Sequence, residues 1–426
     1  MEARRDSLQA YFASPNATLR PIMTSLNGDN SWLISLPRPP ADGAGRVYYH
    51  VVFEPWLAGP TSQIASWFIG ITLPEVPKIA DPEAIEAVIR QIEEAAAGLV
   101  ADSKLTTAGP EGDYGGGIDA ILLEFHFLDH VHEATLRLFN ENIPIIATPE
   151  ATNVVKPWNH FKTITTIQDL SASSKTWRDP ALHPGDPVPS WFTPIRIPGH
   201  SELNFCTALV WTHVADDGRE VHEAIINSPH GTRLDEGPLQ AFLDAEPPTV
   251  KLAMLHGLKE SHTAGWKTTF GVKGGLALYR RLGGVKYWLL SHHSALVYSG
   301  IFMWLSRTID TARTMEWALD EEKKTSQQSE QDLPKPKTVE VENGVFLTVG
   351  TELPISLSVV PTLENGKPGG WPTWGAAWGC QDWGSRGQVK ALFVTENTKT
   401  QPHYKDILAA LGRLYSHATQ HDILSE

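Results

Sequence analysis

One stretch decides the fold of this protein: residues 118–132, which read IDAILLEFHFLDHVH. Residues 118–123 are apolar apart from Asp119, as expected of a strand that is buried on both faces. The residues that follow predict a helix over 134–140 and a second strand over 143–147. This order of strand, loop, helix and strand is typical of α/β folds, which place their chemistry at the carboxyl ends of the strands.

The same alternation continues on both sides of this stretch. Upstream, residues 21–36 hold a polar turn between two apolar runs, which predicts a hairpin. A strand is predicted over 47–53, and apolar residues at helical spacing predict a helix over 81–100. Downstream we predict strands near 193–197, 205–213 and 223–227, a helix at 238–243, a strand at 251–255, a helix at 274–282, a strand at 285–290, a helix at 309–323 and strands at 345–349 and 356–360. This alternation indicates an α/β protein with more than one sheet.

Composition narrows the class of protein. The chain has 426 residues, 41% hydrophobic and 20% charged, which is typical of a globular protein with a sizeable core. Its formal net charge of −14 repels phosphate backbones, so nucleic acid is not an expected partner. Two cysteines, Cys206 and Cys380, are too few for a disulfide framework and favour a reducing compartment. We predict neither a signal peptide nor a transmembrane segment, so the expected location is cytoplasmic.

We expect three parts along the chain: an N-terminal extension over 1–20, the main domain over 21–359 and a C-terminal extension over 360–426. Residues 322–338 are charged and polar with two prolines, which predicts an exposed loop. Residues 368–387 are rich in tryptophan and glycine, and they form either a lid or partner-binding patch, or a cover for an exposed sheet face. Residues 403–421 predict a terminal helix that packs on the main body.

Histidines follow the predicted strands at several points: His126, His130, His132, His200, His230, His256 and His292. A single histidine in such a place is usually a structural hydrogen-bonding residue, whereas several that meet at one sheet edge can bind a metal ion. The pair Asp129 and His130 is the first candidate, because it offers an oxygen and a nitrogen ligand from one tight loop. The alternative interpretation is that Asp129 caps a helix that starts near Glu133.

On these landmarks the sequence resembles the metallo-β-lactamase fold superfamily. The resemblance covers about residues 25 to 359 and rests on the order of short motifs: the hairpin 25–38, FEPWLAGP at 53–60, the strand that enters Asp129-His130-Val131-His132, Pro198-Gly199-His200, Ser228-Pro229-His230-Gly231, Leu255-His256-Gly257, and Tyr287-Trp288-Leu289-Leu290-Ser291-His292. It implies an αβ/βα four-layer sandwich, in which two mixed β-sheets are flanked by helices and the site lies along one edge.

The resemblance also implies which residues bind metal. Two positions of the first metal loop are Phe125 and Phe127 here, so only His200 remains of one of the two metal sites usual in the superfamily. The other site is kept as Asp129, His130, His230 and His292. We therefore expect one divalent cation, with zinc first and iron or manganese as alternatives. Around it we expect outer partners or pocket residues: His126, His132, His200, His256, Phe125 and Phe127.

The function that the resemblance implies is hydrolysis. A bound cation polarises a carbonyl and activates water, and we assign catalytic roles to Asp129 and His230. Aromatic residues are predicted on the early loops: Trp32, Trp56, Trp67 and Phe68. They favour a fairly apolar small substrate with an ester, lactone, thioester or amide bond. The alternative is that these rings only pack the two sheets together. Two alternatives remain: a catalytically inactive protein of this fold that serves as a binding module or scaffold, and a redox member with a di-iron centre, which needs both sites.

Overall fold

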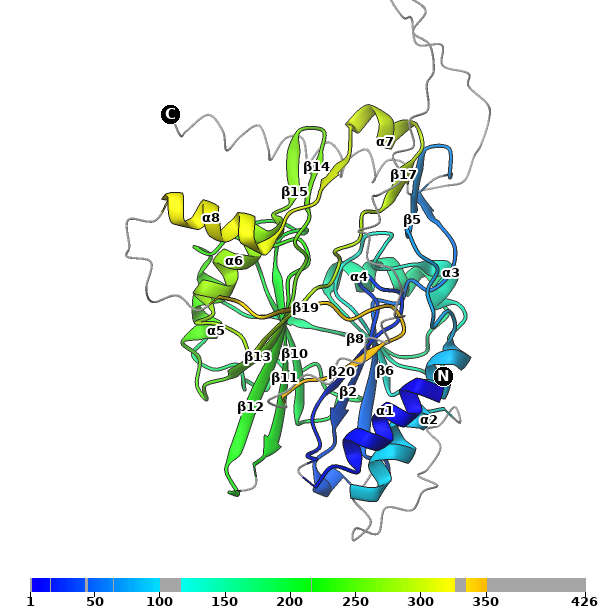
Figure 1. Cartoon of the computed structure of the whole chain (residues 1–426), viewed down its shortest axis with the longest axis vertical. Coiled ribbons are helices and arrows are strands. Elements are labelled where there is room, and N and C mark those ends of the chain that lie inside the picture. Colours follow the sequence, from blue (N-terminus) through cyan, green and yellow to red (C-terminus); the bar gives the residue numbers. More distant parts are fainter. Residues whose placement is uncertain are drawn as a thin grey trace, which may run out of the picture. The chain divides into compact units, whose positions relative to one another are not determined.

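Two mixed β-sheets of seven strands each form the centre of the structure (Figure 1). This computed structural model describes residues 2–15, 17–42, 45–63, 65–99, 116–215, 217–325 and 335–350. They all lie in the unit Met1–Val360. The second unit, Pro361–Glu426, is outside the described residues, and so are the predicted strand 356–360, the tryptophan- and glycine-rich stretch 368–387 and the predicted helix 403–421.

The first sheet has the strand order β20-β1-β2-β3-β6-β7-β8. Its strands are β1 (Ile22–Ser25), β2 (Trp32–Pro37), β3 (Tyr48–Phe53), β6 (Ala120–Leu123), β7 (Ile145–Ala147), β8 (Ile164–Thr166) and β20 (Phe346–Thr348). β1, β2 and β3 are antiparallel, with Ile22 opposite Ser35, which confirms the predicted hairpin. β3, β6, β7 and β8 run parallel, so the βα unit predicted from residues 118–147 is also confirmed.

The second sheet has the strand order β19-β16-β13-β12-β11-β10-β9. Its strands are β9 (Gln168–Asp169), β10 (Phe192–Ile197), β11 (Cys206–Val214), β12 (Glu220–Asn227), β13 (Val250–Leu255), β16 (Tyr287–Leu289) and β19 (Thr338–Val339). The central strands β12, β13 and β16 run parallel to one another, whereas β10, β11 and β12 are antiparallel. The strands predicted near 193–197, 205–213, 223–227, 251–255 and 285–290 are therefore confirmed, with shifts of a few residues at their ends.

Two small three-stranded sheets, which we did not predict, have the orders β17-β5-β4 and β15-β14-β18. Their strands are β4 (Thr61–Gln63), β5 (Ile69–Thr72), β14 (Glu260–Thr263), β15 (Trp266–Thr269), β17 (Val297–Ser299) and β18 (Ile309–Thr311). The helix predicted over 309–323 is wrong at its start, because residues 309–311 are extended and pair with β14. Asp310 holds this strand in place by accepting hydrogen bonds from the Ser261 hydroxyl and the Lys259 ammonium group.

Helices cover the outer faces of the main sheets: α1 (Glu2–Phe12), α2 (Pro82–Ala96), α3 (Glu133–Leu136), α4 (Pro149–Val155), α5 (Gly237–Leu243), α6 (Gly271–Arg281) and α8 (Met315–Thr325), with 3-10 turns at Pro40–Asp42, Ala97–Leu99 and Lys156–Trp158. The short helix α7 (Ile301–Ser306) packs beside β5 and β17 of a small sheet. α2 begins where predicted, because Asp81 accepts a hydrogen bond from the Ala84 amide at 2.7 Å and Pro82 starts the first turn. The helix predicted over 134–140 ends early, at Leu136. No helix among the described residues has both the length and the apolar character to cross a membrane.

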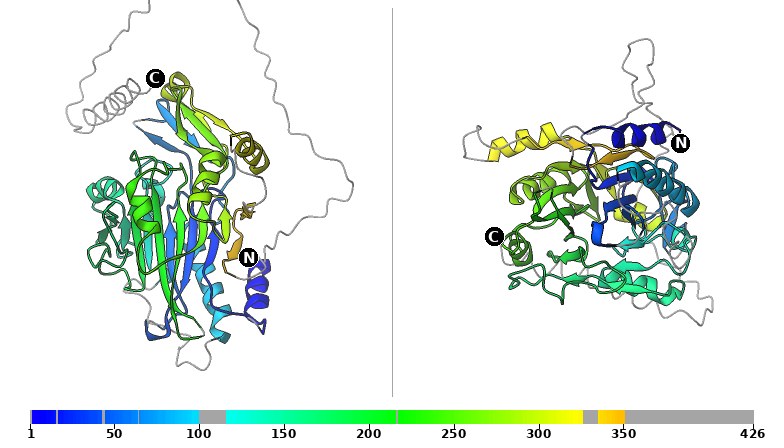
Figure 2. Two further views of the ribbon diagram at one scale, coloured as in Figure 1. Left: turned by 90° about the vertical axis from the view of Figure 1, so that its left-hand side faces the viewer. Right: turned by 90° about the horizontal axis from the view of Figure 1, so that it is seen from below.

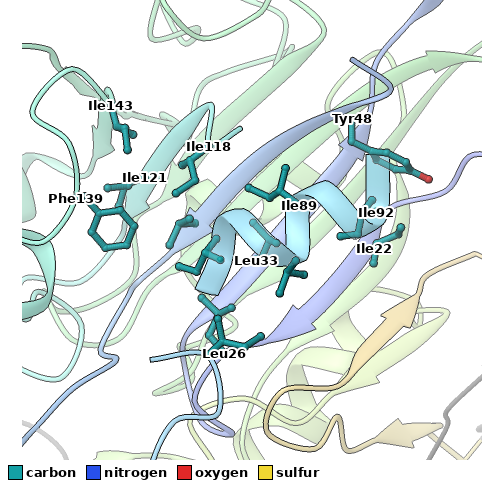
Figure 3. Close-up of a cluster of buried hydrophobic side chains, with 14 of the residues drawn as sticks. Ile22, Leu26, Leu33, Tyr48, Ile89, Ile92, Ile118, Ile121, Phe139 and Ile143 are labelled. Carbon is teal, nitrogen blue, oxygen red and sulfur yellow. The ribbon is translucent and has the colours of Figure 1, made fainter. Parts of the chain in front are cut away.

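Three clusters of buried hydrophobic side chains hold the layers together. One lies between the sheets and joins residues of both, including Trp32 and Leu122 of the first sheet and Leu255 of the second. Another packs the first sheet against its helices, with Ile89 and Ile92 of α2 facing the strands (Figure 3). The third packs α5, α6 and α8 on the second sheet (Figures 1 and 2). The predicted αβ/βα four-layer sandwich is therefore confirmed.

The structure describes parts of two boundary regions of the predicted domains. Residues 1–20 contain α1, whose Leu8, Tyr11 and Phe12 are buried in the same hydrophobic cluster as α2, so this segment packs as part of the unit. The polar tract 322–338 is regular at both ends, because α8 continues to Thr325 and β19 starts at Thr338. The side chain of Glu322 forms an ion pair with Arg280 at 3.0 Å, which holds the end of α8 on α6.

Candidate metal centre

The candidate site residues lie just beyond the ends of strands. Asp129 and His130 follow β6, His230 follows β12 and His292 follows β16. Because β12 and β16 are parallel neighbours of β13, their carboxyl ends lie at one edge of the second sheet. The loop after β6 reaches the same edge from the facing sheet, since one ring nitrogen of each of His130, His230 and His292 lies within 4.8 Å of the other two.

The nitrogens that face one another are Nε2 atoms. His130 Nε2 lies 3.3 Å from His230 Nε2, and the Nε2 atoms of His130 and His292 each lie 3.9 Å from Asp129 Oδ2. The three imidazoles are buried, with at most 7% of each residue exposed. The side chain of Asp129 is 13% exposed and therefore lies on the side of the group that faces solvent.

The opposite nitrogen of each ring, Nδ1, has a partner outside the group. His130 Nδ1 donates a hydrogen bond to Glu54 Oε2 at 2.6 Å. His292 Nδ1 lies 3.4 Å from Asp29 Oδ2, and His230 Nδ1 is hydrogen bonded to Thr269 Oγ1 at 3.1 Å. Such outer partners fix the orientation of an imidazole and leave Nε2 for a metal, as is usual for metal-binding histidines. The group could therefore hold a metal ion.

Glu54 is a functional residue that we did not predict. It follows β3 with a φ of +45°, a left-handed conformation that is unusual for glutamate and typical of constrained sites. Its Oε1 accepts hydrogen bonds from the backbone N–H groups of Glu124 and Phe125 at 3.2 and 3.0 Å, while Oε2 binds His130. The signal available in the sequence was an acidic residue directly after the apolar strand 47–53.

Asp29, in the turn of the first hairpin, was also missed. Its Oδ1 accepts a hydrogen bond from the Ser294 amide at 2.8 Å, and its backbone carbonyl accepts one from the His292 amide at 3.1 Å. Burial alone would raise the pKa of Asp29, but His292 and Lys259 hold it well below its usual value. Asn30, the next residue, donates to the Asp129 carbonyl at 2.7 Å, so one turn positions both loops of the site.

The structure decides between the two interpretations of Asp129. Helix α3 starts at Glu133 with His132, not Asp129, as its N-cap residue, and the His132 side chain forms no capping hydrogen bond. The carboxylate of Asp129 instead faces His130 and His292. The capping interpretation is therefore wrong, and Asp129 belongs to the histidine group.

The electrostatics of the group favour positive charge at its centre. Burial opposes protonation of His130, but the carboxylates of Glu54 and Asp129 outweigh it and raise the pKa of His130 to about 9. Burial and the neighbouring imidazoles of His292 and His130 lower the pKa of His230 well below its usual value, so this ring is neutral and one of its two nitrogens can act as an acceptor. A cation bound among the Nε2 atoms would replace the proton that the carboxylates hold on His130.

Phe125 fills the space beside the group. Its ring stacks on Phe205, with centroids 4.3 Å apart, and contacts His130 and His230 at 4.9 and 5.1 Å. Arg196 lies over the other face of this stack, 4.6 Å from the Phe205 ring. Phe125 is 1% exposed, so this side of the site is closed by apolar and aromatic packing.

The other predicted pocket residues do not join the group. His200 is exposed and stacks on Phe270 with centroids 5.7 Å apart, and His126 lies beside Phe127 and 4.0 Å from Glu202. His132 is hydrogen bonded to Thr135 Oγ1 at 2.7 Å. Phe127 lies at the edge, with its centroid 6.3 Å from His230.

His256 is the last of the predicted pocket residues. Like the three clustered histidines, it is buried, and it has no exposed surface. Its Nδ1 donates to the Gly257 carbonyl at 2.6 Å, and its Nε2 has no hydrogen-bond partner among the described residues. Burial, with a further contribution from His292, lowers the pKa of His256 to about 4, so the ring is neutral.

Comparison with solved structures found proteins similar to this chain at low sequence identity. No protein-family model and no curated sequence matches the chain. A possible metal-dependent hydrolase from Veillonella parvula aligns over 78% of this chain and 100% of its own, with 11% identity and a TM-score of 0.39. An isothiocyanate hydrolase from Delia radicum gut bacteria aligns over 78% and 100%, with 14% identity and a TM-score of 0.42. The metallo-β-lactamase fold protein YhfI from Bacillus subtilis aligns over 76% and 98%, with 9% identity and a TM-score of 0.34.

The fold assignment rests on the architecture of the chain itself. Two mixed sheets face each other, helices cover their outer surfaces, and three histidines from three different loops meet at one edge. These features agree with the αβ/βα four-layer sandwich that the resemblance drawn from the sequence implies.

Proposed function

We propose that this protein is a metal-dependent hydrolase whose single divalent cation is bound by Asp129, His130, His230 and His292. One observation carries the proposal: three buried histidines from distant loops turn Nε2 toward a common point. His130 and His230 also form hydrogen bonds to oxygen at Nδ1, and His292 Nδ1 lies 3.4 Å from Asp29 Oδ2. Such oriented imidazoles are what a metal site requires of its ligands.

The spacing of the nitrogens supports a small cation. Two imidazole nitrogens at about 2.0–2.1 Å from a tetrahedral zinc ion lie roughly 3.3–3.4 Å apart, and the Nε2 atoms of His130 and His230 are 3.3 Å apart. Zinc is therefore our first choice. The carboxylate of Asp129 also suits iron or manganese, which remain the alternatives.

The aromatic packing supports one cation rather than two. Phe125 and Phe205 stack beside His130 and His230, and neither ring offers a ligand atom. His200, which the family pattern would place in the other metal site, stacks on Phe270 at an exposed position. A di-iron redox centre is disfavoured for the same reason, because it needs both sites.

The chemistry follows from the residues. A bound divalent cation supplies Lewis acidity, which polarises a carbonyl and makes water a better nucleophile. Asp129 is the group that solvent reaches, and we assign it the removal of a proton from the attacking water. His230, which is neutral and hydrogen bonded to Thr269, is our candidate for the loosest of the four ligands, and it would pass a proton onward when its Nε2 is not bound to the cation. Glu54 and Asp29 keep the other two rings in position.

We propose an ester, lactone, thioester or amide of a fairly apolar small molecule as the substrate. The phenyl rings of Phe125 and Phe127 beside His230 support an apolar contact. The net charge of −14 disfavours a nucleic acid. We also propose a cytoplasmic location, since the described cysteine, Cys206, is a buried free thiol.

One observation favours a second candidate, an inactive protein of this fold that acts as a binding module. His130 and His230 satisfy each other across 3.3 Å, and the carboxylates around His130 hold its proton, so the group is stable without a metal. Loss of one half of the site to Phe125 is consistent with this alternative.

Metal analysis separates the two candidates. The protein is purified without added metal, and zinc, iron and manganese are measured by mass spectrometry for the wild type, His292→Ala and the control His200→Ala. A hydrolase should carry close to one metal per chain, His200→Ala should keep it, and His292→Ala should lose it. Cleavage of a panel of p-nitrophenyl esters, lactones and thioesters should disappear with the metal. A folded wild-type protein without metal would favour the binding module.

A further inference from the structure

Exposed apolar side chains gather on one surface beyond the two main sheets. We call this surface the apolar crown: Trp67, Val297, Ile301, Trp304 and Leu305. Trp304 is 76% exposed and Leu305 67%, which is far more than apolar residues of this size show in a packed interior. A contiguous exposed apolar patch marks a binding surface.

The crown is a continuous structure. The amides of Ile301 and Phe302, at the start of α7, donate hydrogen bonds to the carbonyls of Trp67 and Phe68 at 2.9 and 3.0 Å. The rings of Phe68 and Phe302 lie 5.7 Å apart. β17, which carries Val297, pairs with β5 in the same small sheet. The exposed side chains are therefore presented by one connected support.

The crown adjoins the candidate metal centre. β17 begins at Val297, shortly after His292, and Thr61 of β4 donates to the Leu128 carbonyl, next to Asp129, at 3.1 Å. Burial and then the carboxylates of Asp310 and Asp129 raise the pKa of Tyr298, so this crown-strand hydroxyl lies within electrostatic reach of the centre. Figure 1 shows α7, β17 and β5 together at the end of the unit, beyond the ends of the main strands.

The charge pattern indicates what the crown binds. Residues 65–73 contain no charged side chain, and residues 296–308 contain only Arg307. At the chain average of 20% charged residues, these two segments would hold about four. These segments are therefore depleted of charge, and their polar residues, such as Ser66 and Ser299, are uncharged apart from Arg307. Tryptophan and aliphatic side chains next to a basic residue are typical of a surface that enters the headgroup region of a lipid layer.

We propose that the apolar crown docks this protein on a phospholipid surface. Trp304 and Leu305 enter the layer, and the guanidinium group of Arg307 lies among the phosphates. Docking itself is independent of the hydrolysis proposed above. If the two act together, the substrate class narrows to lipid esters or amides that pass from the layer to the adjacent centre, and this last step rests on the proposed function.

Vesicle flotation tests the proposal with the full chain. Vesicles of phosphatidylcholine should carry the wild-type protein upward in a density gradient. The double variant W304S/L305S should bind about tenfold less or weaker still, because it loses two of the most exposed apolar anchors. The matched control V76S/L138S, which changes two exposed apolar residues outside the crown, should float like the wild type.

The other outcomes overturn the proposal. A wild-type protein that stays with the soluble fraction, or a W304S/L305S variant that floats as well as the wild type, contradicts lipid docking. A concentration-dependent dimer in light scattering that W304S/L305S abolishes, without flotation, would assign the crown to a second copy of the chain. Melting curves and metal content, both unchanged in W304S/L305S, show that the variant is folded. Flotation needs no turnover, so a metal-free protein that still floats would refute the hydrolase and keep the docking surface.

Discussion

Two histidines of this protein, His50 and His130, each bind a glutamate in the interior, yet their surroundings differ. His50 Nε2 donates to Glu93 Oε1 at 3.0 Å, and His50 Nδ1 accepts from the hydroxyl of Ser35 at 2.9 Å. His130 Nδ1 donates to Glu54 at 2.6 Å, but its Nε2 lies 3.3 Å from another ring nitrogen, His230 Nε2, rather than from a hydroxyl group. Both rings have no exposed surface.

The role of a carboxylate–histidine pair therefore depends on which group the second ring nitrogen of the histidine contacts. Ser35, His50 and Glu93 resemble a nucleophile, a base and an orienting acid in their order of hydrogen bonds. Ser35 has no exposed surface, so no substrate reaches its hydroxyl. The three residues instead connect β2, β3 and α2, since Glu93 also accepts from the amides of Val47 and Tyr48.

Replacing each histidine by alanine gives the largest expected contrast. His130→Ala removes a proposed ligand, so we expect bound metal to fall from about one per chain to less than a tenth. This result requires a loss of metal affinity well beyond 10–100-fold (~1.4–2.7 kcal/mol), which is the loss usual for residues that contact a ligand rather than the metal itself. His50→Ala should keep its metal. Metal content after gel filtration measures both. Equal metal loss in the two variants would show that general destabilisation, rather than a removed ligand, is responsible.

The second contrast concerns stability. His50→Ala should lower the free energy of unfolding by about 3 kcal/mol, because it leaves a buried cavity and an unsatisfied Ser35 hydroxyl. Chemical denaturation followed by circular dichroism measures the change. Ser35→Ala, which removes the hydroxyl and keeps the ring, should cost only about 1 kcal/mol. A His50→Ala protein as stable as the wild type would contradict the structural role of this network.

The two glutamates provide a finer comparison. Glu54→Gln keeps the shape of the side chain but weakens the charged hydrogen bond to His130, so we expect metal affinity to fall about 10–100-fold. Glu93→Gln makes the same chemical change in the other network and should leave metal affinity unchanged. Competition with a chromophoric chelator gives both affinities. Similar losses in both variants would remove the distinction between the two regions.

Much of the fold could be predicted because hydrophobic patterns determine long elements. The βα unit after residue 118 and the helix capped by Asp81 are set by local sequence, and both were confirmed. The two small sheets could not be predicted, because their short strands are stabilised by tertiary contacts. Residues 309–311 show this, since Asp310 bonds to Ser261 and Lys259 on another part of the chain.

The convergence of His130, His230 and His292 was predicted from motif order, because histidines at strand ends leave a mark in the sequence. The residues that contact the Nδ1 atoms of these histidines are less evident in the sequence. Glu54 is a single acidic residue after a strand, and Asp29 lies in a turn where aspartate is common for local reasons. Only the left-handed conformation of Glu54 and the three-dimensional contact of Asp29 with His292 reveal their roles.

The smallest expected effect is the response of the His50 network to acid. Burial alone would raise the pKa of Glu93, but the hydrogen bonds from His50 and from the amides of Val47 and Tyr48 lower it below its ordinary value of 4.5. A carboxylate with a lowered pKa in the folded state stabilises the protein above the pKa of the unfolded chain, and this stabilisation is lost as the pH falls below about 4.5 toward the folded value.

Glu93→Gln isolates this contribution from the many other carboxylates that titrate in the same range. At pH 7 we expect the free energy of unfolding of the variant to be about 1 kcal/mol lower than that of the wild type. This is the loss expected when a hydrogen-bonded carboxylate is replaced by a neutral amide. As the pH falls from 5 to 3, the wild type should lose this advantage, so the two unfolding free energies should approach each other. A difference that stays constant over this range would mean that the carboxylate acts through shape alone. The two networks would then differ less in their electrostatics than in the partner of the second histidine nitrogen, which is Ser35 for His50 and His230 for His130.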